Sequence, residues 1–153
     1  MKKLAILFAF IVFSTMSFAQ EEAHETTKEK AINFGLGYNE GFPIYFGMEW
    51  EMFRDISLGF AVSSNLNAFD WVRFNIKGDY YFDRIIGLPH NFDFYAGISA
   101  GVKTDFEKEK TSSGLDWDAH VGGRWYWNEK WALNLEVGGG YGFGGTFGLS
   151  MRL

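Results

Sequence analysis

The chain has no cysteine among its 153 residues. It therefore forms neither a disulfide framework nor a thiolate metal site. It also lacks a lipid anchor of the lipoprotein type, because that anchor needs a cysteine at the processing site. Positive charge is scarce as well. The formal net charge is -5, which leaves no basic stripe to neutralise phosphates and argues against nucleic-acid binding.

Proline is scarce too, with two residues against 19 glycines, a balance that fits many close-packed strands and turns. Hydrophobic residues make up 47% of the chain and aromatic residues 20%. At this length the chain has room for one domain with a large apolar surface. Without a lipid anchor, any attachment to a membrane must come from the fold.

The first 19 residues indicate a secretory signal peptide. Two lysines lie near its start, an apolar run follows over residues 4–13, and the small residues Ser17 and Ala19 precede a cut before Gln20. An uncleaved membrane helix is the alternative. The apolar run is much shorter than the roughly 20 residues that a helix needs to span a bilayer, so we expect this segment to be removed.

The stretch 115–137 alternates between apolar and polar residues on both sides of a short polar turn at 128–130. A period of two is typical of strands, so the stretch predicts a hairpin of two long strands. Trp125, Trp127 and Trp131 gather on its apolar face beside the turn, and aliphatic or small residues follow further along. A lipid-facing strand places its interfacial aromatic residues in this way.

Residues 20–30 are polar and without period, which predicts a flexible N-terminal segment. The alternation then recurs to the end of the chain and predicts eight strands, at 31–38, 44–52, 56–63, 71–82, 92–102, 115–127, 131–137 and 146–153. Short links alternate with longer ones, and only the link 83–91 interrupts this order. The pattern predicts an all-β fold over residues 31–153, an eight-stranded antiparallel up-and-down transmembrane β-barrel with both termini in the periplasm.

A soluble barrel of the lipocalin type has the same alternation turned inside out, with apolar residues around a ligand. Its outward face should be rich in Lys, Glu and Thr. Here the smaller face is rich in glycine, which favours packing inside a narrow barrel. The apolar face ends in aromatic residues at both rims, and its tryptophans form the predicted aromatic girdle: Trp50, Trp71, Trp117, Trp125, Trp127 and Trp131.

On these grounds the chain resembles the small eight-stranded outer-membrane barrels of the OmpA transmembrane domain and OmpX type. The resemblance is one of layout and covers residues 31–153. The last strand, FGLSMRL, is similar to the terminal insertion signal of this class, although it ends in Leu153 where Phe is common. The signal peptide resembles those of Bacteroidetes-type bacteria. The resemblance implies a Gram-negative outer membrane with its lipid and lipopolysaccharide, and insertion by the barrel assembly machinery.

Several charged residues fall on the inward face of the predicted barrel. Because eight-stranded barrels are filled by side chains, charges there must be paired. We expect a salt-bridge network that closes the interior, and a gated ion path is the alternative. The residues of this predicted interior network are Glu49, Lys77, Asp79, Arg124 and Glu136.

Asp116, Asp118 and His120 share one strand face, so they are candidates for a metal site or an acid and base pair. Alternate strand residues lie about 7 Å apart, too far for all three to hold one ion without a neighbouring strand, and polarity at the rim is the favoured interpretation. A lipid A-modifying enzyme would need a Ser/His/acid set on the lipid face, whereas His120 points inward. We expect no catalytic residue, no metal and no cofactor.

The charged segment 103–114 is predicted to be the longest outer loop. It is the best candidate for contacts with lipopolysaccharide or a surface partner, although a solvated loop is favoured. The sequence thus predicts an integral outer-membrane barrel with a structural or surface-interaction role and no wide pore. A secreted or periplasmic lipocalin-like binder of a hydrophobic ligand is the alternative, and a lipid A-modifying barrel enzyme is a weaker one.

Overall fold

The computed structural model describes residues 30–38, 42–65, 70–107, 110–140 and 144–153. The predicted signal peptide, and the polar segment after it up to residue 29, lie outside this part of the chain. No helix among the described residues is long and apolar enough to cross a bilayer.

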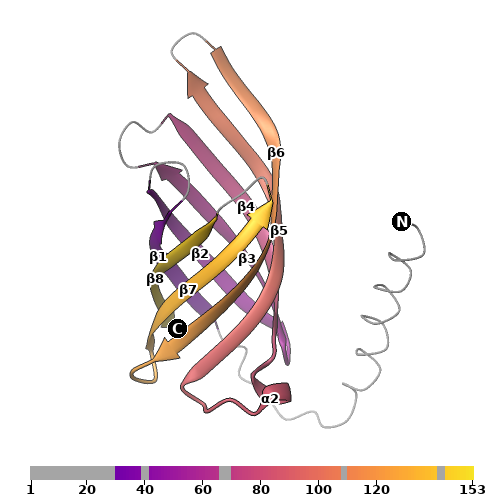
Figure 1. The fold of residues 1–153 in the computed structure, drawn as a ribbon, viewed down its shortest axis with the longest axis vertical. Helices are drawn as coiled ribbons and strands as arrows, with labels where there is room; N and C mark the ends of the chain where they lie inside the picture. The colour runs from indigo at the N-terminus through magenta and orange to yellow at the C-terminus, as the bar shows by residue number, and fades with distance from the viewer. Residues whose placement is uncertain (1–29, 39–41, 66–69, 108–109, 141–143) are drawn as a thin grey trace, which may run out of the picture.

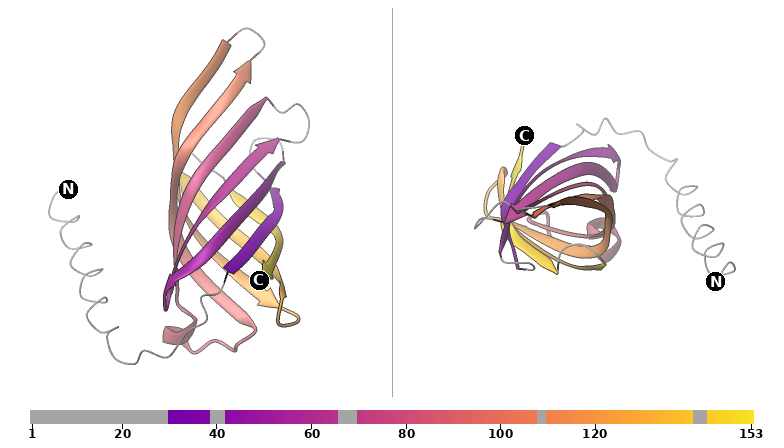
Figure 2. Two further views of the ribbon diagram at one scale, coloured as in Figure 1. Left: turned by 180° about the vertical axis from the view of Figure 1, so that it is seen from behind. Right: turned by 90° about the horizontal axis from the view of Figure 1, so that it is seen from above.

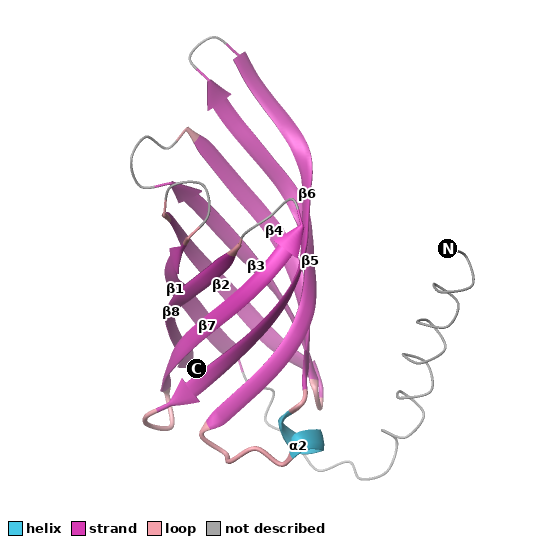
Figure 3. Cartoon of the chain, in the orientation of Figure 1, coloured by secondary structure: helices cyan, strands magenta, loops and turns pink. Residues whose placement is uncertain are grey.

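Eight antiparallel strands form one closed barrel in the order of the sequence, which confirms the predicted fold class (Figures 1 and 3). The barrel closes where the first strand pairs with the last, for example Ile32 with Met151. The view from above in Figure 2 shows this closed ring. The strands are β1 (Lys30–Gly37), β2 (Pro43–Phe53), β3 (Ile56–Asn65), β4 (Trp71–Tyr81), β5 (Phe92–Glu107), β6 (Lys110–Tyr126), β7 (Trp131–Gly140) and β8 (Gly145–Arg152).

The described parts of segment 103–114, residues 103–107 and 110–114, are strand and not loop, so the prediction of a long outer loop is wrong. Strands β5 and β6, of 16 and 17 residues, continue through it as a paired hairpin as far as Glu107 and Lys110. Figure 1 shows this hairpin extending beyond the ends of the other strands. The two faces of this protruding hairpin are not covered as the two faces of the barrel wall are, so the apolar and polar alternation fades here. Backbone pairing does not need the alternation and continues.

The link 83–91 holds a short helix that the sequence did not predict, α2 (Asp83–Ile86). Gly87 ends the helix in the left-handed region, at φ 67°, and Leu88 donates its backbone N–H to the Asp83 carbonyl at 2.9 Å. Glycine adopts this conformation without a steric penalty. The helix explains why this link breaks the alternation of short and long connections.

Polar residues fill the barrel, and large apolar residues cover its outside. The side chains at the centre include Asn33, Glu49, Arg73, Asp79, His120, Arg124 and Ser150, each buried. On the outside, Ile98 and Ile76 keep 69% and 61% of their surface exposed. Inward glycines let neighbouring strands and side chains approach closely. A Cβ on Gly101 would meet the Phe74 carbonyl oxygen and the Asn75 side chain.

Five of the six tryptophans predicted for the girdle lie on the outward strand face. Trp117, Trp125 and Trp127 are exposed, while Trp50 and Trp131 are half-buried. The expectation for Trp71 is wrong, because its side chain is only 5% exposed. Trp71 has the same parity as the inward residue Arg73, and the guanidinium carbon of Arg73 lies 5.1 Å from the Trp71 ring centroid. Position near a rim does not by itself place a ring on the lipid side.

Candidate functional site

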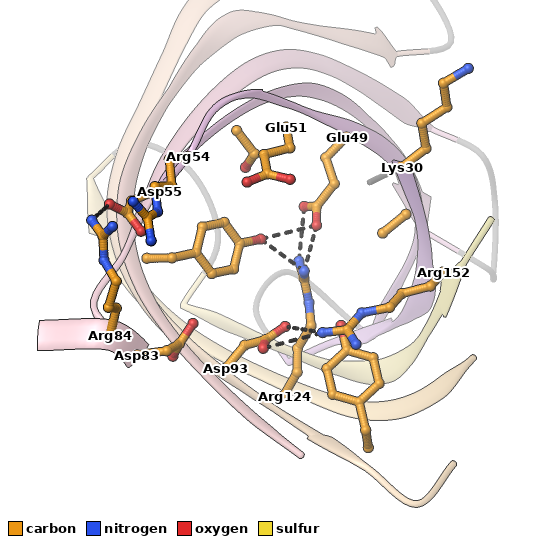
Figure 4. Close-up of a pocket in the computed structure, with 14 residues that line it drawn as sticks. Lys30, Glu49, Glu51, Arg54, Asp55, Asp83, Arg84, Asp93, Arg124 and Arg152 are labelled. Carbon is orange, nitrogen blue, oxygen red and sulfur yellow. Dashed lines mark hydrogen bonds and ion pairs between the residues drawn. The ribbon is translucent and has the colours of Figure 1, made fainter. Parts of the chain in front are cut away.

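Arg124 and Glu49 meet across the barrel axis, from β6 and β2, and form a buried ion pair (Figure 4). Arg124 Nη2 donates to Glu49 Oε2 at 2.8 Å, and Nη1 donates to the Tyr81 hydroxyl at 2.8 Å. The Tyr81 hydroxyl in turn donates to Glu49 Oε1 at 3.1 Å. The Tyr95 ring centroid lies 4.9 Å from the Arg124 guanidinium carbon. A bidentate, hydrogen-bonded pair of this kind fixes both charges in place.

Lys77 is the centre of a second layer of charges above this pair. Its ammonium lies 2.8 Å from Glu136 Oε2 and 3.3 Å from Asp79 Oδ2. The Tyr95 hydroxyl donates to the same Glu136 oxygen at 3.0 Å. The five residues predicted as an interior network thus lie in two adjacent layers, with Tyr95 in contact with both.

His120 lies beside this layer with a carboxylate on each ring nitrogen. Nδ1 is 2.8 Å from Asp118 Oδ1, and Nε2 is 2.7 Å from Asp79 Oδ1. The Ser99 hydroxyl donates to the other Asp118 oxygen at 2.6 Å. His120 therefore links two strands through buried acceptors, and its side chain lies inside the barrel rather than at the rim.

Asp116 does not join His120 and Asp118. It forms an ion pair with Arg73, whose Nε lies 2.8 Å from Asp116 Oδ2, and it accepts a hydrogen bond from Asn75 Nδ2 at 2.8 Å. The three residues that share a strand face thus have different direct partners, and Ser99 connects the two groups because it accepts from Asn75 Nδ2 at 3.1 Å and donates to Asp118. Among the described residues, no group of three or more His, Asp or Glu side chains is placed to hold a metal ion.

At the loop end of the barrel, two cationic side chains lie close to the ring of Trp71. The Arg73 guanidinium carbon and the Lys103 ammonium lie 5.1 Å and 5.2 Å from the Trp71 ring centroid. Cations within about 6 Å of an aromatic face are attracted by its quadrupole. Trp71 therefore lies inside the barrel beside these cations, and it is not an interfacial anchor on the lipid face.

The turn end of the barrel opens into a charged vestibule of about 380 Å³. Its ionisable lining residues are Lys30, Arg54, Arg84, Arg124 and Arg152, with Glu49, Glu51, Asp55, Asp83 and Asp93. Figure 4 shows the Arg124 and Glu49 pair near the middle of this opening. Burial raises the pKa of the Asp83 carboxyl, and the backbone N–H of Phe94 works against that rise.

Above the pair lies a second space of only about 40 Å³, lined by Lys77, His120 and Glu136 among others. A space of this size holds one or two water molecules. The side chains of Lys77, His120 and Glu136 thus lie in the interior above the vestibule.

The sequence did not identify a third set of buried polar contacts. Asn134 Nδ2 donates to the Ser150 hydroxyl at 3.1 Å, and Ser150 donates to Asn33 Oδ1 at 2.5 Å. All three residues alternate with apolar neighbours, so strand parity places them inside. Their mutual contacts depend on barrel closure between β1, β8 and β7, for which the linear pattern carries no signal.

The fold and its interior define a class, the closed eight-stranded antiparallel barrel filled by polar side chains. No family model matches the chain, and no curated protein matches its sequence. The N-terminal β-barrel domain of Pseudomonas aeruginosa OprF is similar in structure, with a TM-score of 0.61 and 13% identity over 84% of this chain and 98% of that one.

Two designed barrels are similar as well. One, designated TMB2.3 and solved by NMR, has a TM-score of 0.59 and 18% identity over 83% of this chain and 94% of its own. The other, from the de novo design of transmembrane β-barrels, has a TM-score of 0.57 and 11% identity over 85% and 98%. At these identities the likeness concerns the fold.

Proposed function

We propose that this protein is an integral outer-membrane β-barrel with a structural or surface-interaction role, no catalytic activity and no wide pore. The observation that carries the proposal is the distribution of polarity across the barrel wall. Large apolar side chains are exposed on the outside of all eight strands, whereas Arg, Asp, Glu and His side chains are buried inside. An exposed apolar band of this extent must be covered by an apolar medium or by another molecule.

A lipid bilayer is the apolar medium that fits a closed barrel. In hydrocarbon every backbone polar group must be satisfied internally, and closure of β1 on β8 leaves no free strand edge along the wall. The fold likeness to OprF and to designed transmembrane barrels supports this proposal. A lipocalin-like binder does not fit, because a hydrophobic ligand needs an apolar cavity and the interior here is charged.

The ends of the chain support an orientation. Lys30 and Leu153 lie together, joined by a 2.9 Å hydrogen bond between their backbone groups. They are at the same end as the short turns at 54–55 and 128–130, opposite the β5–β6 hairpin. We therefore assign this end to the periplasm, after export directed by residues 1–19 and insertion by the barrel assembly machinery.

The protruding β5–β6 hairpin is the part of the barrel that we assign to surface contacts. Residues 111–115 are exposed, and Leu115 keeps 87% of its surface accessible. Within the described chain, β7 pairs with β6 only from Asp118 onward, so residues 111–116 pair with β5 alone. An open strand edge of this kind can add a strand from a partner, and lipopolysaccharide is the other candidate at this height.

Cell fractionation tests the membrane proposal. After lysis without detergent, the protein should be recovered with the outer-membrane fraction and released only by detergent. On a gel, the unboiled sample should migrate differently from the boiled one, because a closed barrel stays folded until it is heated. Recovery in the soluble fraction, with one band before and after boiling, would support a secreted or periplasmic binder instead.

A further inference from the structure

Helix α2 is held at the turn end of the barrel by contacts on both sides. The Asp83 carboxylate accepts a hydrogen bond from the backbone N–H of Phe94 in β5. The Arg84 guanidinium pairs with Asp55, in the link between β2 and β3. Gly87 then turns the chain out of the helix. A four-residue helix is too short to be stable alone. These contacts therefore fix the position of the helix and of its other two side chains, Ile85 and Ile86.

The two remaining side chains of the helix are apolar and exposed. Ile85 keeps 65% and Ile86 54% of its surface accessible, and no residue of α2 is buried. Figure 4 shows Arg84 and the helix outside the ring of strands, while Asp83 points toward the vestibule. Both isoleucines are therefore exposed on a helix that lies outside the ring of strands.

This apolar patch continues the outer surface of the barrel wall. Phe82, directly before the helix, lies in an aromatic cluster on the outward face, with ring centroids 4.8 Å from Tyr80 and 6.0 Å from Phe94. Phe53, at the end of β2 directly before the link that holds Asp55, is also strongly exposed at this rim. Phe82 joins the helix to this outward aromatic cluster, because its carbonyl oxygen accepts from the backbone N–H groups of Ile85 and Ile86 at 2.9 and 3.0 Å.

We propose that α2 is a periplasmic-leaflet anchor, with Ile85 and Ile86 inserted among phospholipid acyl chains and Arg84 at the level of the headgroup phosphates. The inference rests on the proposed membrane location. Continuity with the wall favours lipid over a protein partner, since a partner covering only the helix would leave the adjoining aromatic cluster partly in water. Apolar side chains at the acyl boundary, with a cation reaching up to the headgroups, are the usual arrangement of an interfacial segment.

Because the chain has no cysteine, single cysteines can carry an environment-sensitive dye at chosen positions. We would place it at Ile85→Cys, with Ile86→Cys as a second variant. Ile98→Cys, in the middle of the exposed wall, reports on the membrane itself. Glu129→Cys is the matched control, an exposed residue on the β6–β7 turn at the same end of the barrel. All four positions are exposed, so the substitutions should leave folding intact.

The labelled proteins are reconstituted in phospholipid nanodiscs whose acyl chains carry no bromine, or carry bromine both near the headgroup and near the chain ends. The dyes at 85 and 86 should lose most of their emission in brominated lipid, as should the dye at 98, while the dye at 129 should keep most of it. If 98 is quenched and both helix positions are not, α2 does not insert and the membrane proposal stands. If 98 is not quenched either, the membrane proposal itself fails.

Discussion

Replacing Arg124 by alanine is expected to lower the free energy of unfolding by about 3–5 kcal/mol. The substitution leaves the Glu49 carboxylate buried without its counter-ion, while the Tyr81 hydroxyl and Asn33 Nδ2 still donate to it at 3.1 and 3.2 Å. A buried charge that loses its counter-ion keeps the full penalty of removal from water. Urea unfolding of the reconstituted barrel, followed by tryptophan fluorescence, measures the difference.

Two variants separate this effect from a general loss of packing. In the double variant Arg124→Ala/Glu49→Ala no charge is stranded, so a large part of the lost stability should return. Asp105→Ala removes an exposed ion pair with Lys103 and should change stability by less than about 1 kcal/mol. If Arg124→Ala unfolds at the same urea concentration as the native chain, the pair does not hold the interior together.

Replacing Gly122 by alanine is expected to destabilise the barrel by about 1–3 kcal/mol, because a Cβ at this position overlaps the Tyr95 ring. The ring has little freedom to move. Tyr95 is fully buried, and its hydroxyl lies 3.0 Å from Glu136 Oε2 and 3.3 Å from Asn134 Oδ1. Either the ring shifts and these hydrogen bonds break, or β6 moves away from β5. The same unfolding measurement applies.

The matched control is Gly114→Ala, since a Cβ there has no heavy atom within 4 Å. This variant should unfold like the native chain. In a Tyr95→Ala background the ring is absent, so adding Gly122→Ala should change stability little further. An equal loss of stability from Gly122→Ala in both backgrounds would show that Gly122 is needed for its backbone conformation and not to make room for the Tyr95 ring.

The fold could be predicted because the period-two pattern indicates which face of each strand is apolar and which is polar. That pattern gave the number of strands, their order and the inward set that includes Glu49, Lys77 and Arg124. It is strong here because the two faces differ in chemistry over nearly every strand. Where both faces are polar, as over Thr104 and Ser113, the pattern fades, although these side chains still pair across the hairpin at 3.0 Å.

Contacts across the barrel could not be predicted in the same way. Parity places Arg124 and Glu49 inside, but their pairing depends on strand tilt and stagger, which bring together residues 75 positions apart in the sequence. The same stagger gives Asp116 and His120, four residues apart on β6, different partners on β4. Trp71 shows a related limit, since aromatic character suggested the lipid face while its parity with Arg73 indicated the interior.

The most direct test of this account is which methyl groups touch lipid. Val121 and Val137 form an outward cross-strand pair, whereas the methyls of Ala31 and Ala132 lie inside the barrel. In an NMR spectrum of the protein in lipid nanodiscs, both valines should show cross-peaks to acyl-chain protons and both alanines should show none. Acyl-chain contacts at Ala31 and Ala132, with Val121 and Val137 in contact with water, would contradict it.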